Sequence, residues 1–97
     1  MMEATAPGVP SRDIEIVNKR GLHARAAARF VQLAEKFDAE VTVSKDATTV
    51  GGTSIMGLMM LAAGIGATIR VEATGAEAEA ALAALAELVA TLFGEEE

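Results

Sequence analysis

The chain has 97 residues, a formal net charge of −6, one histidine and no cysteine. This length suits one small domain. The lack of cysteine excludes a disulfide scaffold, a thiolate metal site and a cysteine nucleophile, and a single histidine makes a transition-metal site improbable, so we expect no metal and no cofactor. The acidic balance argues against nucleic acid and anionic lipid as partners.

The charges are unevenly distributed along the chain. Five basic and two acidic residues lie between residues 12 and 29, whereas seven acidic residues and no basic residue follow Arg70. A local basic patch on an acidic body suits an acidic protein partner or an anionic group, although ordinary solvated charge remains the alternative.

Residues 1–12 contain both prolines and small polar residues, which predicts a flexible tail with no signal peptide. Ile14 and Ile16 alternate with acidic residues, which predicts a half-buried strand, and residues 18–21 predict a loop. Apolar residues then recur at spacings of three and four from His23, which predicts a helix that ends near Asp38.

Val41 and Val43 mark a second strand, residues 45–47 a turn, and residues 48–51 a third strand. Ser54 can cap a short helix with its body at residues 55–63, and a fourth strand follows at residues 68–73. The most apolar stretch, residues 55–67, contains three glycines and is too short to span a bilayer, so we expect no membrane insertion.

The last helix has the strongest local signals. Thr74 and Glu77 are spaced as a capping box, and Gly94 suits the C-terminal cap. Its predicted buried stripe comprises Leu82, Leu85, Val89 and Leu92. The resulting order, βαββαβα, predicts an α+β fold with an antiparallel or mixed sheet and helices on one face. The predicted domain spans residues 13–94, followed by an acidic tail at residues 95–97.

One short segment carries residues suited to phosphoryl chemistry. His23 lies where a loop becomes a helix, and the backbone N–H groups of Ala24 and Arg25 beside it would face an anion. Arg25 adds a guanidinium suited to phosphate oxygens, and a neutral imidazole is a competent nucleophile. The segment shows no general base and no second carboxylate, which favours a carrier over a hydrolase. The alternative is that His23 is a capping or surface residue.

The motif GLHARAA at residues 21–27, followed by TSIMGLMML at residues 53–61, resembles the histidine-containing phosphocarrier (HPr) family of the bacterial phosphoenolpyruvate phosphotransferase system. The resemblance covers residues 13–93. It implies an open-faced β-sandwich, with a four-stranded, mainly antiparallel sheet and three helices on one face. The segment VEATGAEAEAAL and the acidic end are more similar to the nitrogen-related branch of the family than to the sugar-uptake branch.

The resemblance also implies roles for single residues. His23 accepts the phosphoryl group on Nδ1 from enzyme I and passes it to a IIA-type protein, while Arg25 and the backbone of Ala24 and Arg25 steady it. Such a protein is a covalent intermediate and not an enzyme. The family's GLHARPA is GLHARAA here, and we expect Ala26 to cost little because proline in the first helical turn only presets φ.

The second motif places Ser54 at the start of the short helix, where the resemblance implies regulatory phosphorylation by an HPr kinase/phosphorylase. The alternative is that Ser54 is only a helix cap. Leu58 and Leu61 supply the inward spacing of this helix, so Ile55, Met56 and Met59 are expected to form a partly exposed docking patch, unless all of them are core. The remaining patch residues are expected to be Arg20, Ala24 and Arg29.

We therefore expect a cytoplasmic, monomeric phosphocarrier. One rival is a regulatory binding module of the same fold, controlled through Ser54 and never phosphorylated on His23. The presence of both His23 and Arg25 argues against it. A second rival is a small ligand-sensing α/β domain, which would need a closed pocket and usually a dimer.

Overall fold

The computed structural model describes residues 9–94. The acidic tail predicted at residues 95–97 and most of the tail predicted at residues 1–12 therefore lie outside the described residues. The first strand, β1 (Ser11–Glu15), begins two residues before the predicted domain boundary. Its pairing with β4 is the reason, because Ser11 lies opposite Glu72 and the N–H of Ala73 donates to the Pro10 carbonyl at 3.1 Å. Strand β1 thus extends two residues beyond the predicted boundary at residue 13, which stays a prediction.

The sheet has four strands, all antiparallel. Strands β2 (Glu40–Lys45), β3 (Thr48–Gly51) and β4 (Thr68–Thr74) join β1 in the order β1-β4-β2-β3. The register places Ile14 opposite Ile69 and Val43 opposite Val71, so apolar side chains lie together on one face. This arrangement confirms the four predicted strands and the antiparallel sheet.

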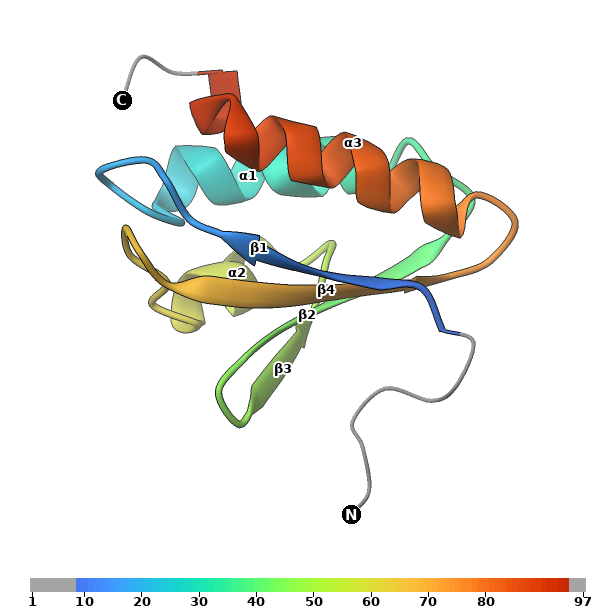
Figure 1. The fold of residues 1–97 in the computed structure, drawn as a ribbon, viewed down its shortest axis with the longest axis horizontal. Helices are drawn as coiled ribbons and strands as arrows, with labels where there is room; N and C mark the ends of the chain where they lie inside the picture. Colours follow the sequence, from blue (N-terminus) through green and yellow to red (C-terminus); the bar gives the residue numbers. More distant parts are fainter. Residues whose placement is uncertain (1–8, 95–97) are drawn as a thin grey trace.

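Three helices complete the open-faced β-sandwich, as expected. Helix α1 (Ala24–Ala34) and helix α3 (Ala78–Ala90) run side by side in opposite directions across one face of the sheet (Figure 1). The short helix α2 (Ile55–Met60) packs against α1 and β3. Buried residues of α1, α2, α3, β1, β2 and β4 belong to a single core cluster, and Val50 of β3 packs against it. The other face of the sheet carries polar residues, among them Thr42, Ser44, Arg70 and Glu72.

Helix α1 ends at Ala34, so its predicted end near Asp38 is wrong. The backbone tightens after Ala34, since the N–H groups of Lys36 and Phe37 donate to Leu33 and Ala34, three residues back. The Asp38 carbonyl then accepts from the Glu77 N–H at 2.9 Å, at the start of α3. Likewise α2 ends at Met60 and not at residue 63, and the chain turns at Ala62 with φ of 53°.

The predicted capping box of the last helix is also wrong. Thr74 is the last residue of β4, where it pairs with Glu40, and Gly75 turns the chain with φ of 121°. Helix α3 starts at Ala78 with Glu77 as its N-cap, which makes no side-chain cap bond. The Glu77 carboxylate instead accepts from the Asp38 N–H at 2.7 Å. Sheet pairing therefore outcompetes the local helix signal at Thr74.

The chain after α3 differs from the prediction as well. The C-cap of α3 is Thr91 and not Gly94, and Leu92 is only half-buried. Residues Leu92, Phe93 and Gly94 have positive φ values of 62°, 57° and 79°, in a short 3-10 turn. This turn buries Phe93 completely, and its carbonyl accepts a hydrogen bond from the Arg29 guanidinium on α1. Burial of the ring offsets the cost of the left-handed backbone.

Candidate functional site

His23 occupies the N-cap of α1. Its backbone is extended, with φ of −72° and ψ of 177°, and its side chain is half-buried and makes no cap bond. Its carbonyl accepts the first helical hydrogen bond, from Ala27 N–H at 2.8 Å. The N–H groups of Ala24, Arg25 and Ala26 thus precede the first intrahelical bond, at the positive end of the helix dipole.

Ala24 and Arg25 directly follow His23 in the first turn of α1, and both are exposed. The start of α1 therefore carries the three groups that the sequence predicts for phosphate binding: the His23 imidazole, the Arg25 guanidinium and the backbone N–H groups of Ala24 and Arg25. This combination is an environment suited to a phosphoryl group. Ala26, which stands where the family has proline, is the third helical residue and is completely buried.

A tight loop holds His23 in place. The N–H of Gly21 donates to the Asn18 carbonyl at 3.2 Å, and the Asn18 side-chain amide donates to the Gly21 carbonyl at 2.9 Å. The next residue, Leu22, donates its N–H to the Ala63 carbonyl at 3.0 Å, just beyond α2. The completely buried Asn18 was not singled out by the sequence analysis. The sequence feature that could have indicated its role is an asparagine at the first position of a turn, here residues 18–21.

Ser54 is the N-cap of α2, and its hydroxyl accepts a hydrogen bond from the Gly57 N–H at 2.9 Å. The capping expectation is confirmed. The side chain is also exposed, so the hydroxyl faces solvent at the beginning of the helix.

The side chains of α2 divide into two sets. Leu58 and Leu61 are buried, whereas Ile55, Met56 and Met59 are 40%, 68% and 40% exposed. The expectation that these three are exposed is confirmed, and the alternative that all are core is wrong. Three further exposed apolar residues were not included in the predicted docking patch: Val17, Met60 and Ile65. A helix of six residues presents most of its surface to solvent, which is why Met60 is exposed too.

Arg20 and Arg29, the two basic residues predicted for docking, differ in their surroundings. Arg20 is exposed on the loop that precedes His23. Arg29 is half-buried, and one guanidinium nitrogen donates to the Phe93 carbonyl. Arg29 thus ties α1 to the C-terminal end of α3, which lies at the same end of the molecule as the start of α1 (Figure 1). Its part in docking stays a prediction.

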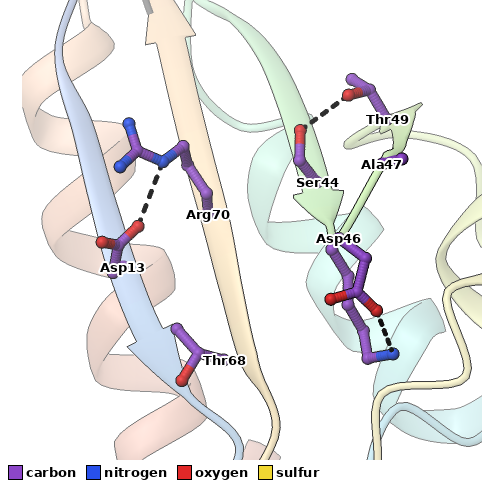
Figure 2. Close-up of a pocket in the computed structure, with 8 residues that line it drawn as sticks. Asp13, Ser44, Asp46, Ala47, Thr49, Thr68 and Arg70 are labelled. Atoms are coloured by element: carbon purple, nitrogen blue, oxygen red, sulfur yellow. Dashed lines mark hydrogen bonds and ion pairs between the residues drawn. The ribbon is translucent and has the colours of Figure 1, made fainter. Parts of the chain in front are cut away.

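A shallow hollow of about 440 Å³ lies elsewhere, on the uncovered face of the sheet. Six of its polar side chains are paired with one another. Arg70 lies 3.2 Å from Asp13 and Ser44 lies 2.8 Å from Thr49 (Figure 2). Lys45 lies 3.3 Å from Asp46. None of the residues predicted for the site lines it. This open hollow is not the closed pocket that a ligand-sensing domain would need.

Among residues 9–94, no group of three metal-ligating side chains is close enough together to hold a metal ion. Across the same residues, no helix is long and apolar enough to cross a membrane.

Comparison with known proteins identifies the family. A family model described as "PTS HPr component phosphorylation site" matches residues 10–91. The chain belongs to the HPr family. Phosphocarrier protein HPr of Cupriavidus necator is 50% identical over 86 residues, covering 89% of this chain and 97% of that protein. Phosphocarrier protein NPr of Shewanella violacea is 44% identical over 84 residues, covering 87% and 92%.

Solved structures agree with this assignment to the HPr family. The crystal structure of HPr-C-His from Thermoanaerobacter tengcongensis has a TM-score of 0.86 at 45% identity, covering 91% of this chain and 99% of that chain. A phosphocarrier protein HPr from Bacillus anthracis has a TM-score of 0.79 at 44% identity, covering 82% and 95%. Membership of the HPr family supports a phosphocarrier role in the phosphotransferase system.

Proposed function

We propose that this chain accepts a phosphoryl group on Nδ1 of His23 from phosphorylated enzyme I and passes it to a IIA-type protein. The Nδ1 lone pair attacks phosphorus, and the bond to the donor breaks with its electron pair staying on the donor. The reverse exchange at the IIA-type protein regenerates His23. The observation that carries the proposal is the position of His23 at the N-cap of α1, with Arg25 two residues on, in a chain of the HPr family.

The local geometry suits a carrier that holds a phosphoryl group for a short time. The start of α1 supplies backbone N–H groups and the positive end of a dipole, and Arg25 supplies a permanent charge. These groups stabilise phosphate oxygens without activating water. The chain is therefore a covalent intermediate in a relay and not an enzyme with turnover of its own.

Docking of both partners is assigned to the exposed side chains of α2 and the neighbouring basic residues. Ile55, Met56 and Met59 offer an apolar surface, and Arg20 and Arg25 offer positive charge at its edge. The bond between Leu22 and Ala63 joins this surface to the loop that holds His23. Methionine suits a surface that must fit more than one partner.

Ser54 is proposed as a regulatory phosphorylation site for an HPr kinase/phosphorylase. Its exposed hydroxyl begins α2, where a phosphate is tolerated electrostatically and the helix need not unfold. The new charge would lie beside the apolar docking surface and weaken docking. A purely regulatory module acting only through Ser54 is the alternative function. The relay is assigned to the cytoplasm and to a monomer.

The test is incubation with enzyme I, Mg²⁺ and phosphoenolpyruvate, followed by intact-mass measurement. We expect one acid-labile phosphoryl group on the wild type and none on His23→Ala. An Arg25→Ala protein should still fold but accept the group more slowly. No mass change on the wild type, with enzyme I shown to be active, would overturn the relay and leave Ser54 as the leading candidate.

A further inference from the structure

All methionines among residues 9–94 lie on one helix. Met56, Met59 and Met60 are 68%, 40% and 72% exposed, all on the six-residue helix α2. They are the only methionines among residues 9–94, and the buried core contains none. Met59 and Met60 follow Met56 by three and four residues, so both are neighbours of Met56 on the helix surface.

Chemical change at these sulfur atoms would leave the attachment of α2 intact. Leu58 and Leu61 anchor the helix in the core, at 0% and 4% exposure, and Ser54 caps its first turn. The cap bond, from the Gly57 N–H to the Ser54 hydroxyl, involves no methionine. A modification of the thioethers therefore alters the surface of α2 while the fold persists.

Thioethers are also the most readily oxidised side chains that the sequence offers, because it has no cysteine, tryptophan or tyrosine. A peroxide transfers one oxygen atom to the sulfur: R–S–CH₃ and H₂O₂ give R–S(O)–CH₃ and H₂O. Sulfur is oxidised by two electrons and the peroxide is reduced by two. The product is polar, and methionine sulfoxide reductases reverse the change.

We propose that the methionine cluster of α2, defined as Met56, Met59 and Met60, is a reversible oxidation site that controls docking of phosphotransfer partners. The inference rests on the proposed function, since it assigns the cluster to the docking surface. Oxidation converts apolar contact area into strongly polar sulfoxide. Burying that oxygen against a partner without a donor weakens docking by about tenfold.

The experiment treats the purified full chain with hydrogen peroxide and quenches it at intervals. Peptide mapping locates the sulfoxides, and the initial rate of phosphoryl acceptance is measured at an enzyme I concentration below saturation. Each protein is compared with its own rate before treatment. The control is the M56L/M59L/M60L protein, which retains Met1 and Met2, and far-UV circular dichroism follows the fold.

We expect sulfoxide at Met56 and Met60 before Met59, in the order of their exposure, with unchanged circular dichroism. The wild-type rate should fall about tenfold, the triple variant should keep its starting rate, and reductases for both sulfoxide epimers should restore the wild type. Full oxidation with an unchanged rate would overturn the inference alone. An equal loss in the triple variant would also overturn it. If untreated wild type accepts no phosphoryl group, the proposed function fails and the inference with it.

Discussion

Gly21→Ala tests whether the close approach between the His23 loop and the end of α2 holds the site together. Gly21 has φ of 64°, and a Cβ there would overlap the Ala63 carbonyl oxygen and lie 2.8 Å from Gly64 Cα. Ordinary contacts between carbon atoms are about 3.5–4.0 Å, so the two segments must separate by about 1 Å. That shift breaks the 3.0 Å bond from the Leu22 N–H to the Ala63 carbonyl.

The expected cost follows from two terms. A left-handed alanine costs about 1–2 kcal/mol, and the broken bond between buried residues costs about 1–3 kcal/mol. A loss of about 3 kcal/mol in the free energy of unfolding lowers the Tm of a domain this size by roughly 12 °C or more. Because His23 follows this loop directly, the rate of phosphoryl acceptance should fall as well.

The assay is thermal unfolding followed by circular dichroism, with the enzyme I reaction as a second readout. Gly64→Ala is the matched control, since a Cβ there has open space and the position is exposed. It should change the free energy of unfolding by no more than about 0.5 kcal/mol. If Gly21→Ala has the same Tm as Gly64→Ala and the wild type, the reasoning from the close approach is wrong.

Three further predictions concern single positions. Asn18→Ala removes the bond to the Gly21 carbonyl and should cost about 1–3 kcal/mol in urea unfolding; a cost near zero would exclude Asn18 as a positioning residue. Ala26→Pro should raise the free energy of unfolding by about 0.4–1 kcal/mol, because the Ala26 N–H precedes the first helical hydrogen bond. Ala28→Pro, in mid-helix, should lower the free energy of unfolding by about 3 kcal/mol. Equal effects would show that α1 starts elsewhere. Phe93→Ala should lower the free energy of unfolding by about 3–5 kcal/mol, because the Phe93 ring is completely buried. A change as small as that of a surface substitution would contradict its place in the core.

The strands show how much of the fold local patterns determine. Alternation of buried and partly exposed residues in β2 and β4 is visible in the sequence, and so is the turn at Asp46. Placing Val43 and Val71 on the same face then excludes a one-residue slip of the register. The cap at Ser54 was predictable for the same reason, because its bond to Gly57 spans three residues.

The site was predictable where its parts are neighbours in the chain. His23 and Arg25 come together because one helix starts between them, and the leucines of α2 indicate which methionines face solvent. Asn18 and Gly21 were not predictable in the same way. Their importance depends on contact with Ala63 and Gly64, which the sequence does not place nearby.

The element ends that the sequence analysis placed wrongly are those fixed by distant partners. Thr74 pairs with Glu40 in the sheet, and the Glu77 carboxylate bonds to the Asp38 N–H across 39 positions, so the predicted capping box does not form. Arg29 bonds to the Phe93 carbonyl across 64 positions and holds the left-handed turn after α3. A local signal such as a helix cap contributes about 1 kcal/mol to stability. It therefore determines where an element begins or ends only where no stronger tertiary interaction competes with it. Burial of a whole side chain such as that of Phe93 contributes more to stability than one such local signal. Only the tertiary structure decides where that burial occurs.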